Sequence, residues 1–217
     1  MKLLSIKAAR VVWLFPTTDV NPRGKYIYPL LPALIERYQF SNVPNLQEAI
    51  KKQQGIKLAS GAYNLKKKES IAVDLGIYND GLVGDSRSST ADSEAFLQDC
   101  INFATKEFGL QEPKSVTRQL VSEINFELSQ PLAVLNPRLT PFLKKLSGKV
   151  SDTHDSSFEL SGLSFNGFGN GPRNPPSFKF ERVENTAVSE NRFWSFAPVS
   201  TDDHLALIEE FISLLKK

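Results

Sequence analysis

Apolar and polar residues alternate along the stretch from Gln119 to Leu128. One side of it would carry Leu120, Ser122, Ile124, Phe126 and Leu128, and the other side Gln119, Val121, Glu123, Asn125 and Glu127. This period of two predicts a β-strand, because successive side chains of a strand point to opposite faces. We therefore expect a strand with one apolar face and one wet face.

Two other stretches place apolar residues at every third or fourth position, as a helix packed on a sheet does. The first holds Phe96, Cys100, Phe103, Ala104 and Phe108, and the second Leu205, Ile208, Phe211, Ile212 and Leu215. Ser89 and Ser200 stand three residues before Asp92 and Asp203. This arrangement is similar to a capping box and places negative charge at the helix N-terminus. Both stretches are predicted to be core-facing helices.

The chain contains an internal duplication. Residues 21–23 read Asn-Pro-Arg, and so do residues 136–138, at an offset of 136 − 21 = 115. The segment Ser-Thr-Ala-Asp at 89–92 recurs as Ser-Thr-Asp-Asp at 200–203, at an offset of 200 − 89 = 111. The landmarks stay in register with few insertions. We expect repeat one to span 1–112 and repeat two 113–217, together forming one globular domain with a pseudo-twofold axis.

Each copy is predicted to run strand, helix, three strands, helix. For copy one the strands are Ser5–Phe15, Ile56–Tyr63, Ile71–Tyr78 and Leu82–Asp85, and for copy two Gln119–Leu128, Ser157–Phe165, Ser177–Glu184 and Arg192–Pro198. Asparagine and proline suit the first turn of a helix, which predicts short helices over Tyr26–Tyr38 and Leu139–Leu146. The expected fold class is α+β: two tandem β-α-β-β-β-α repeats forming a mainly antiparallel sheet of eight strands with helices on one face.

This doubled order of elements, with an Asn-Pro-Arg start before each short helix, resembles the TATA-binding-protein-like fold over nearly the whole chain. In that family the open sheet face grips the DNA minor groove. Here the corresponding face would carry a mixture whose carboxylates would repel phosphates: Glu123, Asn125, Glu127, Lys179 and Glu181. The resemblance therefore implies the fold without the DNA-binding saddle.

The net charge of +2 conceals an uneven distribution. Residues 1–70 carry 12 Lys/Arg against 4 Asp/Glu, which gives +8, and residues 71–130 carry 4 against 10, which gives −6. The basic part would contact nucleic-acid phosphates, or it is a set of solvated lysines. The phosphate contacts under the first alternative are Lys51, Lys52, Lys57, Lys66, Lys67 and Lys68.

Composition excludes several classes. The 41% hydrophobic content is typical of a globular chain, and the single cysteine, Cys100, permits no internal disulfide. Lys7 and Arg10 interrupt the apolar run that a signal peptide needs, and no stretch reaches the length of a membrane span. We expect a cytoplasmic protein without a metal or other cofactor, and neither a membrane nor a small-molecule partner is indicated.

No set of residues predicts a catalytic site. His154 and Asp155 could join a nearby serine, but no nucleophile elbow surrounds them. The glycine-rich segment 166–176 lacks the Gly-Lys-Ser/Thr ending of a phosphate-binding loop. Asp74, Asp80, Asp85 and Asp92 could attract a divalent cation, although turn formation and helix capping explain two of them. An enzyme is not favoured, but a cleft between the copies stays open as an alternative.

Residues typical of protein interfaces gather in copy two. Trp194 and Phe196 share one strand face, and they form a partner surface or belong to the core, depending on which face the helices cover. The leading hypothesis is a non-enzymatic interaction protein, a subunit of a larger assembly, that docks through its exposed sheet face or long loops. Its expected contact residues are Phe168, Arg173, Arg192, Trp194 and Phe196. The alternative is nucleic-acid binding through the first 70 residues.

Overall fold

A computed structural model describes residues 1–24, 28–45, 55–64, 69–135, 137–150, 158–168 and 176–215. In copy one the elements are β1 (Lys2–Leu14), α1 (Thr17–Val20), α2 (Leu30–Tyr38), β2 (Ile56–Asn64), β3 (Ser70–Tyr78), β4 (Gly81–Ser86) and α4 (Thr90–Phe108). In copy two they are β5 (Thr117–Glu127), η1 (Leu132–Leu135), α5 (Leu139–Val150), β6 (Gly162–Phe165), β7 (Phe178–Arg182), η2 (Val188–Glu190), β8 (Arg192–Ala197) and α6 (Thr201–Leu215).

The strands join one sheet in the order β2-β3-β4-β1-β5-β8-β7-β6. The order of copy two mirrors that of copy one, because β5, β6, β7 and β8 take the places of β1, β2, β3 and β4. The hairpin pairings within each copy are antiparallel. The predicted α+β fold with two β-α-β-β-β-α repeats is confirmed.

Several predicted boundaries were wrong. The first helix of copy one begins at Leu30 instead of Tyr26, because Pro29 stands at its N-cap position and Tyr28 lies in a turn. The helix α5 continues to Val150 instead of ending at Leu146. Strand β6 begins only at Gly162, because the amide of Phe158 donates to the hydroxyl of Ser147 in α5 rather than to a neighbouring strand.

Two short helical turns were not predicted. They are α1 over 17–20 and η1 over 132–135, and both ends of these turns differ by 115 residues. That offset equals the one between the two Asn-Pro-Arg segments, of which Asn136 lies outside the described residues. The copies therefore match from the turn through the arginine. They differ immediately afterwards, since α5 begins at the next residue whereas α2 begins seven residues after Arg23.

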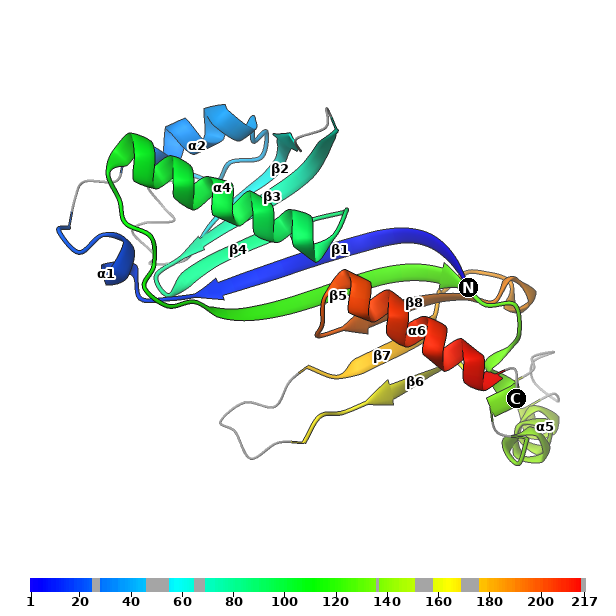
Figure 1. The fold of residues 1–217 in the computed structure, drawn as a ribbon. Coiled ribbons are helices and arrows are strands. Elements are labelled where there is room, and N and C mark those ends of the chain that lie inside the picture. Colours follow the sequence, from blue (N-terminus) through cyan, green and yellow to red (C-terminus); the bar gives the residue numbers. More distant parts are fainter. Residues whose placement is uncertain are drawn as a thin grey trace. The chain divides into compact units, whose positions relative to one another are not determined.

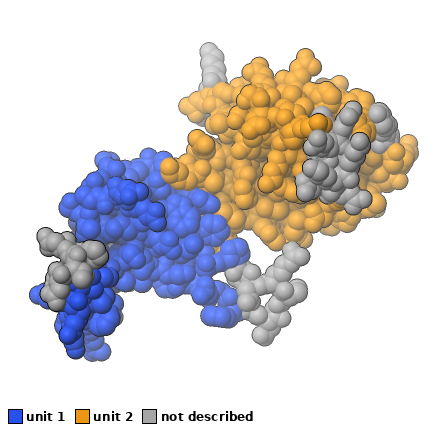
Figure 2. All heavy atoms as spheres, turned by 180° about the vertical axis from the view of Figure 1, so that it is seen from behind, with its two compact units in different colours: residues 1–5, 123–197, 202–217 blue, residues 6–122, 198–201 orange. Residues whose placement is uncertain are grey.

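The chain divides into two compact units, which Figure 2 colours separately. Unit 2 comprises residues 6–122 and 198–201, and unit 1 comprises residues 1–5, 123–197 and 202–217. Within unit 2, α2 and α4 cover one face of β2, β3 and β4 (Figure 1). Within unit 1, α6 covers β7 and β8 (Figure 1).

The core of unit 2 lies between α2, α4 and the strands. Phe96 and Leu97 of α4 are fully buried against Val11 of β1 and Leu75 of β3. The ring of Tyr38 meets the ring of Phe96 edge-on with centroids 5.0 Å apart. The Tyr38 hydroxyl donates to Asp99 Oδ2 at 2.6 Å, which ties α2 to α4. Aromatic packing, this hydrogen bond and the Arg37–Asp99 ion pair at 3.0 Å thus join the two helices.

Unit 1 is built on a cluster of phenylalanines. Phe126, Phe180 and Phe193 come from β5, β7 and β8 and are fully buried. The ring of Phe211 from α6 lies 4.8 Å from that of Phe180, and Ile208 of the same helix is fully buried. The apolar face predicted for 119–128 is confirmed, because Ile124, Phe126 and Leu128 are buried.

The N-terminus of α4 is capped as predicted. Ser89 Oγ accepts from the amide of Asp92 at 3.0 Å, and its own proton goes to Asp92 Oδ2 at 2.8 Å. The first residue of α4, Thr90, also exchanges two hydrogen bonds with Thr201, the first residue of α6. Each threonine hydroxyl accepts from the other residue's amide at 3.0 Å. These residues are equivalent under the 111-residue offset.

Candidate interaction surface

The two faces of β8 differ in burial. Phe193, Ser195 and Ala197 are fully buried, whereas Trp194 and Phe196 are half-buried. Alternate residues of a strand point to opposite faces, so Trp194 and Phe196 lie on the face turned away from the core of unit 1. No described helix of unit 1 covers that face. The sequence left open whether Trp194 and Phe196 face the core or the outside, and the structure places them on the outward face.

Three neighbouring strands fix the orientation of Trp194. Its indole Nε1 donates to Glu123 Oε2 of β5 at 3.3 Å. The ammonium of Lys179 on β7 stands 5.1 Å from the Trp194 ring centroid, in a cation–π contact. The Phe196 ring lies 6.4 Å away along β8. The indole is thus held in place while part of its surface stays accessible.

The other predicted partner residues are placed differently. Arg192 shares a strand face with Trp194 and is exposed, and its Nε forms an ion pair with Glu190 Oε2 at 3.0 Å. Phe168 follows β6 and is 90% exposed. Arg173 lies outside the described residues. The structure therefore brings together Arg192, Trp194 and Phe196 on β8, and it does not join Phe168 to them.

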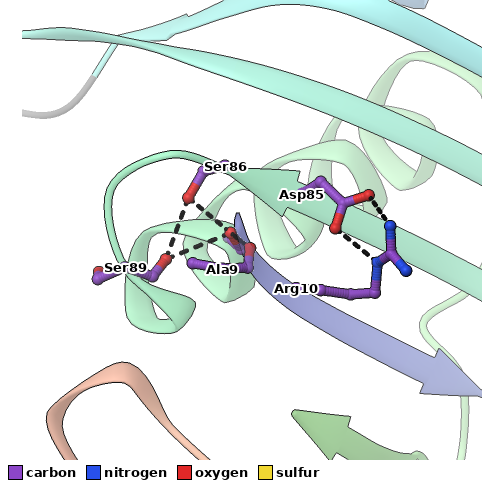
Figure 3. Close-up of polar contacts among 6 residues, drawn as sticks. Ala9, Arg10, Asp85, Ser86 and Ser89 are labelled. Atoms are coloured by element: carbon purple, nitrogen blue, oxygen red, sulfur yellow. Dashed lines mark hydrogen bonds and ion pairs between the residues drawn. The ribbon is translucent and has the colours of Figure 1, made fainter. Parts of the chain in front are cut away.

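A second outward face, on unit 2, carries a row of charges that the sequence did not predict. Arg10 pairs directly with Asp85 across β1 and β4, and Asp85 pairs directly with Asp74 across β4 and β3. The Arg10 guanidinium donates Nε to Asp85 Oδ1 at 2.7 Å and Nη2 to Asp85 Oδ2 at 2.9 Å (Figure 3). This two-point contact neutralises one of two facing carboxylates, whose repulsion would otherwise destabilise the pairing.

The second carboxylate, Asp74, serves a β-bulge in the neighbouring strand. Its Oδ1 accepts from the amide of Ser60 at 2.7 Å, where the pairing of β2 with β3 shifts between Leu58 and Gly61. Ser60 has a φ of 58°, in the left-handed region that few non-glycine residues adopt. The Asp74 side chain thus supplies the partner that the irregular ladder does not give this amide.

Two hollows lie over this row of charges and share Arg10, Asp74 and Asp85. The larger has a volume of about 400 Å³ and is also lined by Lys7 and Arg87. The smaller has a volume of about 330 Å³ and includes Lys57. Both hollows are therefore lined by charges of both signs, with Lys7, Arg10 and Arg87 beside the two carboxylates in the larger and Arg10 and Lys57 in the smaller.

A network of serines supports this face from behind. Ser93 Oγ of α4 donates to the carbonyl of Ala9 at 2.7 Å and lies 2.8 Å from Ser86 Oγ. Ser86 Oγ donates in turn to the carbonyl of Ser89 at 3.2 Å (Figure 3). Ser93 is fully buried. These bonds fasten the start of α4 to β1 and β4 beneath Arg10 and Asp85.

The predicted nucleic-acid contacts are largely untested by the fold. Lys51, Lys52, Lys66, Lys67 and Lys68 lie outside the described residues. Lys57 lies on β2 and is exposed beside the smaller hollow. The hollows add Lys7 and Arg87 as cations that the sequence did not single out, and Asp74 and Asp85 as carboxylates that oppose phosphate binding.

A serine–histidine pair is present, but it is built for structure. Ser195 Oγ lies 2.8 Å from His204 Nε2, and both residues are fully buried in unit 1. Ser195 donates its only hydroxyl proton to the carbonyl of Lys179 at 3.0 Å. The 2.8 Å contact with His204 Nε2 joins β8 to α6 inside this core. His154 and Asp155, the pair suggested by sequence, lie outside the described residues.

The other chemical candidates from the sequence are the Cys100 thiol and a group of aspartates. Burial raises the pKa of the Cys100 thiol to about 12, so the thiolate nucleophile does not form near neutral pH. Within the described ranges, no three His, Cys, Asp or Glu side chains gather in a way that could hold a metal ion. In the same ranges, no helix is both long and apolar enough to cross a membrane.

Comparisons with known proteins yield one similar solved structure and neither a family model nor a curated relative. No protein-family model matches the chain, and no curated protein matches it. A solved structure of the TBP of Methanococcus jannaschii is similar over 99% of this chain and 97% of that chain, with 13% sequence identity and a TM-score of 0.47. At this TM-score the likeness carries no conclusion about the fold family or the function of this chain.

Proposed function

We propose that this chain is a non-enzymatic interaction protein, a subunit of a larger assembly, that binds a protein partner through the outward sheet face of unit 1. The observation that carries the proposal is the placement of Trp194 and Phe196. Both lie beside each other on the face opposite the buried Phe193, where no described helix covers them. Aromatic side chains in such positions supply most of the binding energy of protein interfaces.

The surroundings of Trp194 support this proposal. Glu123 and Lys179 fix the indole, so little side-chain freedom is lost when a partner covers it. Lys179 also stands 3.9 Å from Glu181, and Arg192 completes a rim of mixed charge on the same strands. An apolar centre with a charged rim is the usual organisation of a protein interface. A partner would be chosen by the pattern of charges around the two aromatic rings.

We also propose that residues 1–112 and 113–217 are two copies of one module. The turns α1 and η1 support this, since both of their ends differ by 115 residues. The reciprocal hydrogen bonds between Thr90 and Thr201 support it independently, because they join residues equivalent under the second offset. The duplication would explain two similar scaffolds whose outward faces carry different residues.

The test of function is gentle affinity purification of the full chain from its native host, with and without nuclease. The double variant Trp194→Ala/Phe196→Ala is compared with wild type and with Leu207→Ala, which removes an exposed apolar side chain of α6. We expect a stoichiometric protein partner that resists nuclease and falls at least tenfold in the double variant only. Equal recovery by all three chains would contradict the proposal.

The alternative function, nucleic-acid binding, is favoured by one described residue, Lys57 at the edge of the smaller hollow. The nuclease arm of the experiment addresses it directly. Recovery that disappears with nuclease, together with an excess of absorbance at 260 nm, would replace the protein-partner proposal by this alternative. Nucleic-acid binding should also weaken steeply with added salt, since phosphate contacts release counterions.

A further inference from the structure

The helix α5 leaves its apolar side chains uncovered. None of its residues is buried, in contrast to every other helix of nine residues or more that the structure describes. Phe142 is 60% exposed and Leu139 is 37% exposed. A soluble helix of this length normally buries one face, because an isolated helix of 12 residues is marginal in water. The exposure of Phe142 therefore marks α5 as a contact element.

The exposed residues belong to a continuous stripe. Leu139, Phe142, Leu143, Leu146 and Val150 recur at helical spacing, so they share one side of α5. Leu143, Leu146 and Val150 are half-buried against the chain itself. Ser147 fastens this side, since its hydroxyl accepts from the amide of Phe158 at 2.9 Å. The stripe is thus half-buried at Leu143, Leu146 and Val150 and exposed at Leu139 and Phe142.

The charge around the stripe has a single sign. The segment 137–150 contains Arg138, Lys144, Lys145 and Lys149 and no aspartate or glutamate. The three lysines are exposed. An occupant of this surface must bring apolar contacts for Phe142 and negative charge for the lysines.

Two kinds of occupant have that chemistry: an acidic protein groove lined with apolar residues, and an anionic membrane. Membrane-surface helices insert a whole apolar face, and even one myristoyl chain gives only marginal attachment. In α5 three of the five stripe residues are already half-buried, and Leu139 and Phe142 together offer fewer carbon atoms than a myristoyl chain. The exposed surface of Leu139 and Phe142 is enough for a protein groove that receives a single aromatic anchor.

We propose that α5 is a docking helix for a protein whose groove is acidic and apolar, with Phe142 as the anchor and Lys144, Lys145 and Lys149 as the charged contacts. This surface goes beyond the proposed function, because it involves neither Trp194 nor the sheet face. Its failure would leave the sheet-face proposal standing, and the reverse also holds.

The experiment places the photoreactive residue p-benzoylphenylalanine at position 142 of the full chain, in cells of the native host. A matched chain carries it at position 207, an exposed leucine of α6. The same two chains are made with Lys144→Glu/Lys145→Glu/Lys149→Glu, and with the control reversal Lys2→Glu/Lys106→Glu/Lys114→Glu at other exposed lysines. Circular dichroism verifies that each chain is folded.

We expect one protein adduct at position 142 that is absent from position 207. It should fall at least tenfold with the α5 charge reversal and persist with the control reversal. The purified partner should bind Phe142→Ala at least tenfold more weakly and should prefer low salt. The proposal is overturned if no adduct forms at position 142, or if the adduct yield is unchanged by the α5 charge reversal.

A separate vesicle-binding experiment tests whether α5 binds an anionic membrane instead of a protein. The purified chain and its Phe142→Ala variant are sedimented with vesicles of phosphatidylcholine and phosphatidylglycerol at three to one. Binding that requires both Phe142 and the anionic lipid would overturn the protein-groove proposal in favour of a lipid surface. Absence of vesicle binding, together with the charge-dependent adduct, supports the groove.

Discussion

The first long helix of each copy carries an apolar stripe, but only α2 buries its stripe. Leu30, Leu31, Leu34 and Tyr38 of α2 are buried, and no residue of α5 is. Tyr38 is further bonded to Asp99 of α4, and in α5 the hydroxyl of Ser147 accepts a hydrogen bond from the amide of Phe158. The stripe of α2 thus belongs to the core of unit 2, whereas the stripe of α5 lies at the surface of unit 1.

The largest change in the free energy of unfolding is expected when one stripe residue of each helix is replaced by alanine. Leu34→Ala should destabilise unit 2 by about 2–5 kcal/mol, because it leaves a cavity at a site that is 3% exposed. Phe142→Ala should change the free energy of unfolding by less than about 0.5 kcal/mol. Urea titration in a Trp194→Phe background reports on unit 2 through Trp13, and far-ultraviolet circular dichroism follows the whole chain. Similar losses in both variants would show that α5 is packed like α2.

The contrast between α2 and α5 also shows which features of the structure could be predicted from the sequence and which could not. Periodicity identified α4, α6 and the apolar face of β5, because spacing alone determines which residues share a face. It could not foresee that α5 stays uncovered, since an apolar stripe does not reveal what packs against it. The row Arg10, Asp85, Asp74 was equally hidden, because it depends on the register between three strands. The buried Ser195–His204 pair was not predicted either, because it depends on how α6 packs against β8.

A second test uses alkaline pH, because all five tyrosines and the only cysteine lie before residue 101. Burial raises the pKa of Cys100 from 9.0 to about 12, and burial also raises the pKa of Tyr38 above its ordinary range. The folded chain therefore holds more protons than the unfolded chain above pH 9. Stability is complete below pH 9 and falls as the pH rises toward 12, by about 1.4 kcal/mol per pH unit for each such group.

The measurement is a series of urea titrations between pH 8 and pH 10.5, followed by Trp13 fluorescence in the Trp194→Phe background. Cys100→Ala should lose the part of the slope that belongs to the thiol. The position equivalent to Cys100 in copy two is Phe211, so the unfolding of unit 1, read through Trp194 in a Trp13→Phe chain, should lack this contribution. An unchanged slope in Cys100→Ala would contradict the assignment.

A third test concerns the equivalence of the copies at Thr90 and Thr201. Thr90→Val leaves the buried amide of Thr201 without its partner, and Thr201→Val does the same to Thr90. Each should cost about 1–3 kcal/mol, the price of an unsatisfied buried amide. Thr105→Val is the matched control, because the buried Thr105 hydroxyl has no hydrogen-bond partner among the described residues. It should be neutral or stabilising in thermal unfolding. Unequal costs at Thr90 and Thr201 would argue against their equivalence.

A small effect is expected at Arg10, which pairs with Asp85 on the outward face of unit 2. Removing the guanidinium by Arg10→Ala leaves Asp85 and Asp74 facing each other across β4 and β3. The Arg10 side chain is 49% exposed, so the loss should be no more than about 1 kcal/mol and should shrink with added salt. Adding Asp85→Asn to Arg10→Ala should recover most of it, because the remaining carboxylate, Asp74, still accepts from Ser60. If the double variant were as unstable as Arg10→Ala, the guanidinium would contribute through packing on the strands and not through neutralising the facing carboxylates.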